Sequence, residues 1–246
     1  MSEAARKGCR VAFFGGSFDP PHLGHLAVAR AARVGLGLDE VLFAPVGAQP
    51  LKPVGATANF DDRVAMTRLA IEGEPGFAIS LADAPKESGG PNYTVETLEN
   101  LQRELGRDCA LFCLMGADSF ASMRLWHRAE EVPFVAALVV ASRPGERVDD
   151  LESSLPVGLT MEPADGRELP ESDVEVRCYS IAGGSGIWSG RRASFYLLPG
   201  LDVAISASHI RELANEQMGA EGGSLAGVEM LPDAVAEYVR ANELYR

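Results

Sequence analysis

Short, fully apolar runs separated by stretches of helical character dominate the first 145 residues of the chain. Apolar runs of about four to eight residues that end in turn residues are typical of buried strands. The predicted strands are 10–14, 41–45, 77–80, 109–115 and 134–141, and the predicted helices are 22–34, 60–72, 95–105, 205–217 and 232–242. Buried strands that alternate with helices form a parallel sheet, because each crossover helix covers one of its faces.

The expected fold is therefore α/β, a Rossmann-like doubly wound parallel sheet. A length of 246 residues fits one large domain or a domain with an added subdomain. Residues 145–194 break the pattern, with acidic residues first and then several glycines among serines. We expect a single domain over residues 8–246, with a flexible or inserted segment at 145–194 before the C-terminal helices.

Charge and hydropathy exclude several classes of protein. The net charge of −13 repels polyanions, so no extended nucleic-acid binding is expected. A small anion remains compatible with this charge, because a pocket needs only a few local cations and aligned backbone amides. The apolar runs fall far short of the roughly 18 residues that a membrane span requires. Without an apolar leader at the N-terminus, we expect a cytoplasmic protein that does not bind membranes.

The four cysteines show no metal-binding pattern. Cys9, Cys109, Cys113 and Cys178 include no CxxC pair and have no histidine cluster nearby. We therefore expect reduced, structural thiols rather than zinc ligands.

The segment that follows the first predicted strand carries the strongest functional signal. It reads Gly15-Gly16-Ser17-Phe18-Asp19-Pro20-Pro21-His22-Leu23-Gly24-His25. Two histidines three residues apart at a helix start lie on one face, and Gly24 between them lets a phosphate approach the backbone. A bare HxGH is more often a plain turn with two surface histidines. Its place after a strand and two glycines favours a site for a triphosphate.

A second helix start has similar chemistry. It reads Ile205-Ser206-Ala207-Ser208-His209-Ile210-Arg211. If Ser206 caps a helix, its hydroxyl and the first-turn amides form an anion site, and Arg211 then lies near the positive end of the helix dipole. The alternative is a simple capped surface helix. Two such helix starts far apart in sequence are better explained by one polyphosphate held from two sides.

Residues 16–25 resemble the signature of the HxGH nucleotidylyltransferase superfamily, and the longer string is similar to that of bacterial nicotinate mononucleotide adenylyltransferases. Further similar segments follow in the same order as in that family. They are Pro91-Asn92-Tyr93-Thr94-Val95-Glu96-Thr97-Leu98, Gly116-Ala117-Asp118, Leu125-Trp126-His127 and residues 205–211. The resemblance covers roughly residues 10–145 and 196–246. Ala207-Ser208 departs from the usual Ser-Thr, a mild change if backbone amides do most of the binding.

The resemblance implies adenylyl transfer from ATP to nicotinate mononucleotide, a step of NAD biosynthesis, with Mg²⁺ carried mainly by the substrate phosphates. The implied catalytic residues are His22, His25, Lys52 and Arg211. The implied ATP-binding residues are Gly15, Gly16, Ser17, Phe18, His22, Gly24, His25, Gly116, Asp118, Ile205, Ser206, Ser208 and Arg211. The implied mononucleotide-binding residues are Ser17, Lys52, Tyr93, Thr94, Trp126, His127 and Arg143. None is assigned as a metal ligand.

Several of these residues have ordinary structural explanations as well. Asp118 follows a buried strand, where a carboxylate can accept both hydroxyls of a ribose, but it could equally be a solvated loop residue. Trp126 could stack on a pyridine ring or simply fill the core. Lys52 and Arg143 follow predicted strands and could be plain surface cations.

Other enzyme classes lack their motifs. The chain has no GxxxxGK[ST], Gly35-Leu36-Gly37 lacks the third glycine of GxGxxG, and Gly183-Gly184-Ser185-Gly186-Ile187 fails at the last position of GxSxG. The remaining alternatives are another superfamily member, which would use nicotinamide mononucleotide, phosphopantetheine or a cytidine donor, and a nucleotide-sensing module without activity. Release of pyrophosphate would separate an enzyme from a sensor. A homo-oligomer stays open.

Overall fold

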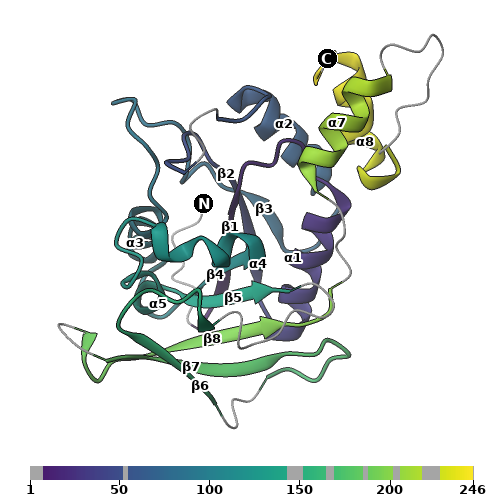
Figure 1. Ribbon diagram of the computed structural model, residues 1–246. Helices are drawn as coiled ribbons and strands as arrows, with labels where there is room; N and C mark the ends of the chain where they lie inside the picture. The colour runs from purple at the N-terminus through teal and green to yellow at the C-terminus, as the bar shows by residue number, and fades with distance from the viewer. Residues whose placement is uncertain are drawn as a thin grey trace.

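One mixed sheet organises the molecule, with strand order β3-β2-β1-β4-β5-β8-β7-β6 (Figure 1). The computed structural model describes residues 8–51, 55–142, 152–164, 169–184, 188–201, 206–217 and 228–245. The strands are β1 (Arg10–Gly16), β2 (Glu40–Pro45), β3 (Phe77–Ile79), β4 (Ala110–Gly116), β5 (Ala137–Ala141), β6 (Leu159–Pro163), β7 (Arg177–Gly183) and β8 (Arg192–Leu198). The helices are α1 (Leu23–Leu36), α2 (Phe60–Ala70), α3 (Thr94–Leu105), α4 (Ala117–Ala121), α5 (Val132–Val135), α7 (Ala207–Gln217) and α8 (Asp233–Ala241), with 3₁₀ turns at Met123–Leu125 and Val228–Met230.

The six strands from β3 to β8 in this order pair in parallel, which confirms the predicted α/β class. Five of them were predicted from the apolar runs. The run at 134–141 was predicted as strand throughout, but α5 occupies its first residues and β5 begins only at Ala137. Pro133 stands in the first turn of α5, where it starts a helix without removing a needed donor.

The segment 145–194, expected to be an insertion or a flexible excursion, contributes β6, β7 and the first residues of β8 within its described part. β6 pairs antiparallel with β7, and β7 pairs antiparallel with β8, so the segment extends the sheet at one edge. Val174 and Val176 pack against α1, where a Cβ on Gly35 would lie only 2.8 Å from Val176. The described part of this segment is therefore an ordered part of the single domain.

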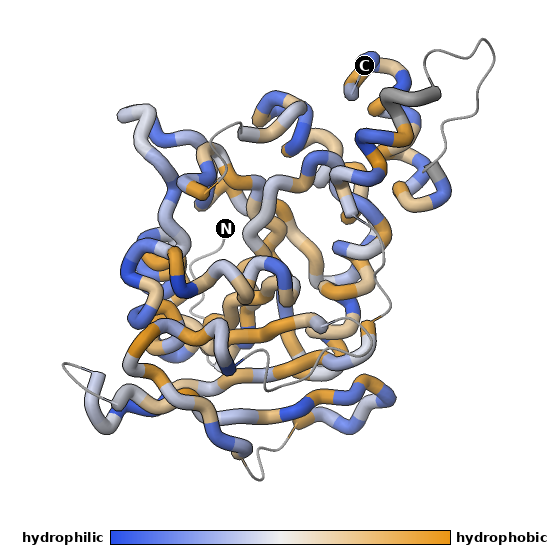
Figure 2. The backbone as a smooth tube through the Cα atoms, in the orientation of Figure 1, coloured by the Kyte–Doolittle hydropathy of each residue, from blue (hydrophilic) through white to orange (hydrophobic). Residues whose placement is uncertain are grey.

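Two apolar layers cover the faces of the sheet. Because side chains alternate along a strand, Phe13 of β1 packs with α3, α4 and α5, whereas Phe14 packs with α1. Figure 2 shows hydrophobic residues, in orange, along the central strands. Hydrophilic residues, in blue, lie in outer turns and along the outer helices, where they alternate with orange ones. A third, smaller cluster joins α2, α7 and α8 away from the β6 edge (Figure 1). None of the described helices is both long and apolar enough to cross a bilayer.

The prediction of four reduced thiols is wrong for one pair. β1 and β4 are neighbours, and Arg10 lies opposite Ala110, so the residues just before these strands meet. Cys9 and Cys109 have Cα atoms 4.5 Å apart and form a disulfide, while Cys113 and Cys178 form no disulfide, as expected. Cys9 and Cys109 are 100 residues apart, so the sequence did not indicate that they meet. Their contact depends on the order of the strands in the sheet.

Candidate active site

A cleft of about 1040 Å³ opens at the carboxyl ends of β1, β4 and β5. Ligands of open α/β sheets bind at this edge. The predicted residues that line the cleft are Gly15, Gly16, Ser17, Phe18, His22, Gly24, His25, Tyr93, Thr94, Gly116, Asp118, Trp126, His127, Ser206, Ser208 and Arg211. Three others, Lys52, Arg143 and Ile205, lie outside the described residues. The structure thus brings both proposed phosphate motifs to one cleft.

The loop between β1 and α1 is held by a buried aromatic residue. Phe18 has φ +46°, a conformation that side chains other than glycine rarely adopt, and its ring is only 1% exposed. The ring packs 5.0 Å from that of His25 and 5.6 Å from that of Phe43. The side chain of Phe18 therefore supports the loop from the apolar core beside the cleft.

His22 and His25 form a close pair at the start of α1. Their ring centroids lie 3.7 Å apart, and the backbone N–H of His22 donates to Nδ1 of His25 at 3.1 Å. Because Nδ1 of neutral His25 accepts this bond, its ring proton lies on Nε2. Nδ1 of His22 is buried without a hydrogen-bond partner among the described residues. The pair therefore has polar ring atoms available to a ligand.

Both histidines are neutral at physiological pH. Burial lowers the pKa of His22 to about 4. Burial and the neighbouring His22 together lower the pKa of His25 well below its usual range. The two rings are therefore neutral hydrogen-bond donors rather than fixed cations.

The second helix start reaches across to this loop. Ser206 Oγ accepts the backbone N–H of His209 at 3.2 Å, so Ser206 caps α7, as the capping hypothesis required. Nη1 of Arg211 donates to the carbonyl oxygen of Asp19 at 2.6 Å, and Nη2 donates to Ser208 Oγ at 3.1 Å. Arg211 thereby links α7 to the β1–α1 loop. His209 is exposed and lies 4.0 Å from Glu212.

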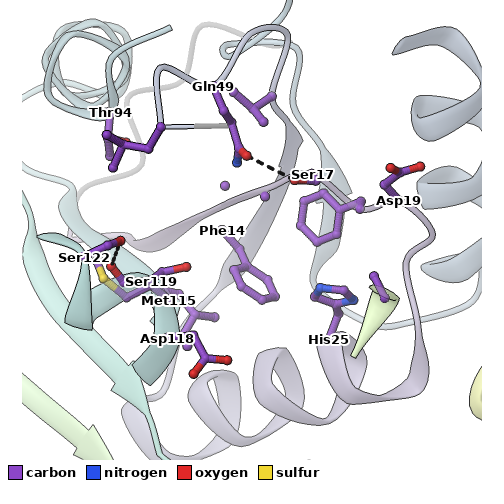
Figure 3. Close-up of a pocket in the computed structure, with 18 of the residues that line it drawn as sticks. Phe14, Ser17, Asp19, His25, Gln49, Thr94, Met115, Asp118, Ser119 and Ser122 are labelled. Atoms are coloured by element: carbon purple, nitrogen blue, oxygen red, sulfur yellow. Dashed lines mark hydrogen bonds between the residues drawn. The ribbon is translucent and has the colours of Figure 1, made fainter. Parts of the chain in front are cut away.

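The opposite wall of the cleft comes from the end of β4. Gly116 ends the strand and precedes α4, and Asp118 lies exposed in the first helical turn. Figure 3 shows Asp118 and His25 on opposite sides of Phe14. A carboxylate and an imidazole pair thus face the cleft from two different strand ends.

Aromatic side chains and a helix start form a further wall. Tyr93 precedes α3, and its ring lies 4.3 Å from that of His127 at an angle of 34°. Trp126 lines the cleft and also packs against the core. Ser17 Oγ donates to Oε1 of Gln49 at 3.3 Å across the cleft (Figure 3).

Sequence reasoning missed the residue that fixes the inner side of the phosphate loop. Arg63 of α2 is only 2% exposed, and burial lowers its pKa. Its guanidinium donates to the carbonyl oxygens of Ser17 at 2.7 Å and of Val46 at 2.8 Å. An arginine within a helix that also carries Asp61, Asp62 and Arg68 looks like a surface residue, so only the fold reveals this contact.

The donor set of the cleft does not form a metal cage. No group of three or more His, Cys, Asp or Glu residues with suitable spacing occurs in the part of the chain that the structure describes. The cleft instead offers imidazole, guanidinium, hydroxyl and backbone N–H groups, which suit phosphate oxygens.

These features define a nucleotide-handling α/β protein, and comparison with known proteins gives its class. The family model described as cytidylyltransferase-like matches residues 13–213, so the chain belongs to this nucleotidyltransferase family. Within it, the chain is similar to proteins named as probable nicotinate-nucleotide adenylyltransferases. The one from Dechloromonas aromatica is 36% identical over 236 residues, which cover 96% of this chain and 97% of the relative. The one from Gloeobacter violaceus is 37% identical over 217 residues, which cover 87% and 100%.

A solved structure has the same fold. It is the Plasmodium falciparum nicotinic acid mononucleotide adenylyltransferase complexed with NaAD, with a TM-score of 0.65 and 15% sequence identity. The match covers 96% of this chain and 97% of that chain. The resemblance inferred from residues 16–25 and the later segments is therefore confirmed.

Proposed function

We propose that this chain transfers the adenylyl group of ATP to nicotinate mononucleotide, giving nicotinate adenine dinucleotide and pyrophosphate. The observation that carries the proposal is the shared cleft, which is lined by the starts of α1, α3 and α7 and by Asp118. The names of the relatives support the same reaction. We further propose that residues 8–246 act as one nucleotidylyltransferase domain in the cytoplasm, where both substrates would be used.

On the phosphate side, His22 and His25 hold oxygens of the reacting phosphates as neutral donors. Ser206 and Ser208, with the first amides of α7, bind the leaving pyrophosphate beside Arg211. Lys52 adds a positive charge near the same phosphates. Support comes from the contacts of the paired imidazoles and of Arg211 with the β1–α1 loop.

The mechanism needs no covalent enzyme intermediate. The 5′-phosphate of the mononucleotide arrives ionised and attacks the α-phosphorus, while the bond from that phosphorus to the bridging oxygen of pyrophosphate breaks. Alignment can contribute about 7 to 11 kcal/mol to such a reaction. Donors that are neutral and preorganised then stabilise the developing charge without having to reorient.

The two nucleoside ends occupy different walls in this proposal. Asp118 accepts the ribose hydroxyls of the adenosine, next to the backbone at Gly116. The N-terminus of α3 at Tyr93 and Thr94 binds the pyridine carboxylate, because a helix start favours an anion over a neutral amide. Trp126 and His127 pack against the pyridine ring, and Arg143 adds a cation nearby.

Mg²⁺ enters this scheme with the substrate. The described cleft residues do not fit a protein-held metal, since Asp19 already accepts two backbone N–H groups and a tyrosine hydroxyl. The ion would instead be held mainly through the substrate phosphates and water, and it would supply positive charge to the reacting phosphates. The residues of the chain bind and align the resulting complex.

Mass spectrometry of the products tests the proposal directly. The purified chain is incubated with Mg²⁺ and ATP or CTP, together with nicotinate mononucleotide, nicotinamide mononucleotide or phosphopantetheine. We expect the nicotinate dinucleotide and pyrophosphate as the main products. Equal rates with the acid and the amide would contradict the role of the α3 N-terminus. Binding of ATP without product would identify a sensing module instead.

A further inference from the structure

The last turn of the chain contacts the phosphate loop through a buried carboxylate. Asp19 is only 3% exposed, and an ionised carboxylate at such a depth must be compensated by donors. It accepts the backbone N–H groups of Thr57 at 2.6 Å and of Ala58 at 3.0 Å. The hydroxyl of Tyr245, 226 residues away in sequence, donates to it at 2.9 Å.

Tyr245 is placed to act only as a donor. It is 7% exposed and packs in the cluster of α2, α7 and α8, with its hydroxyl 3.9 Å from Met66 Sδ. Burial and the charge of Asp19 raise the pKa of Tyr245, so the phenol stays protonated. It does not appear among the residues that line the cleft, so any effect on a ligand passes through Asp19.

Asp19 also contacts Arg211, through a hydrogen bond and an ion pair. Nη1 of Arg211 donates to the Asp19 carbonyl and lies 3.8 Å from its carboxylate. The same residue thus joins the β1–α1 loop, the start of α7 and the end of the chain. In Figure 3 the carboxylate of Asp19 is turned away from Phe14.

We propose that Tyr245 is a positioning residue, which holds Asp19 so that Arg211 and the β1–α1 loop grip the polyphosphate of ATP together. This inference rests on the proposed function, because it assigns that polyphosphate to Arg211. Loss of the phenol hydroxyl frees one side of the Asp19 carboxylate. The carboxylate is then held less firmly, and Arg211, 3.8 Å from it, loses the fixed position that it takes beside the cleft.

The test is Tyr245→Phe, with Tyr238→Phe as a matched control. The hydroxyl of Tyr238 also donates to a carboxylate, that of Asp62 in α2, and lies 2.9 Å from Oδ1. Its partner is therefore Asp62 and not Asp19. Calorimetry with Mg–ATP should give a dissociation constant raised about tenfold for Tyr245→Phe, which is about 1.4 kcal/mol. We expect kcat/KM for ATP to fall by a similar factor in Tyr245→Phe, while its dissociation constant for nicotinate mononucleotide stays within about twofold of that of the unaltered chain. In Tyr238→Phe, the ATP dissociation constant and kcat/KM for ATP should both stay within about twofold.

A purely structural role predicts another result. Tyr245→Phe would then lose thermal stability, and neither variant would change the ATP dissociation constant well below its melting temperature. That result overturns the proposal, as would an equal loss of ATP affinity in Tyr238→Phe. If dinucleotide product is absent with the unaltered chain, the proposed function fails, and ATP binding still decides this inference.

A second variant keeps the proposal testable if Tyr245→Phe does not fold. Asp19→Asn removes the charge that joins the network, and we expect the same selective loss of ATP affinity. The effects of substitutions within one network are not additive. In the Asp19→Asn background, Tyr245→Phe should therefore lower ATP affinity by less than a further factor of two, about 0.4 kcal/mol. Additive losses would overturn the coupling through Asp19.

Discussion

Two regions supply the phosphate side of the cleft, and their positions are fixed in different ways. The loop at residues 16–25 is held between β1 and α1, with Gly16 accepting the backbone N–H of Val46 at 2.9 Å and Phe18 buried beside it. The described parts of the carboxyl-terminal segment, residues 206–217 and 228–245, form hydrogen bonds to residues 176 to 226 positions away in sequence. The loop is therefore held mainly by contacts within the first 63 residues, whereas the carboxyl-terminal segment is held by contacts that span most of the chain.

The largest expected effect comes from the loop at residues 16–25. Replacing His22 or His25 by Ala should lower turnover by about 10² to 10³, because each removes one preorganised donor to the reacting phosphates. Release of pyrophosphate under saturating ATP measures this. His209→Ala is the matched control, since that imidazole is exposed and contacts Glu212. Near-normal turnover of both loop variants would refute the assignment.

The burial of His22 also predicts that the free energy of unfolding depends on pH, an effect slightly smaller than the one on turnover. Its folded pKa of about 4 lies below the ordinary value of 6.5, so the unfolded chain binds the proton first as the pH falls. The contribution is fully present above about pH 6.5 and is lost toward pH 4, by about 3 kcal/mol. His25, whose pKa is also lowered, changes stability in the same direction.

Urea unfolding at several pH values measures this change. Comparison with His22→Asn at each pH removes the contribution of the carboxylates, which both proteins share. We expect the two free energies of unfolding to converge on acidification. Parallel curves between pH 7 and pH 4 would mean that His22 is not buried as a neutral ring.

The same contrast explains what the sequence could predict. Apolar runs and the HxGH segment are local patterns, so five of the six parallel strands and the place of His22 and His25 were predicted within a few residues, whereas the parallel strand β8 was not. Ser206 was predictable as a cap because capping depends on residues within one turn.

Contacts between distant segments could not be predicted in this way. Arg63 and Tyr245 look like ordinary surface-helix and terminal residues, and their partners become clear only from the packing of α2 and α8. The Cys9–Cys109 pair depends on the adjacency of β1 and β4. β6 and β7 were missed because these partly exposed strands, at and next to the sheet edge, lack a continuous apolar run.

The smallest expected effect belongs to the segment built by distant contacts. Ser206→Ala removes the hydroxyl that caps α7, which should destabilise this helix by about 1 kcal/mol. This loss corresponds to a roughly fivefold rise in the hydrogen-exchange rate of the amides of α7. Ser206→Thr keeps an acceptor oxygen and should retain most of the protection. Exchange in α1 should be the same in both variants, because the β1–α1 loop is held by its own strand and by Phe18. If α1 exchange rises together with that of α7, the two halves of the site unfold as one unit, and the distinction between local and long-range construction is wrong.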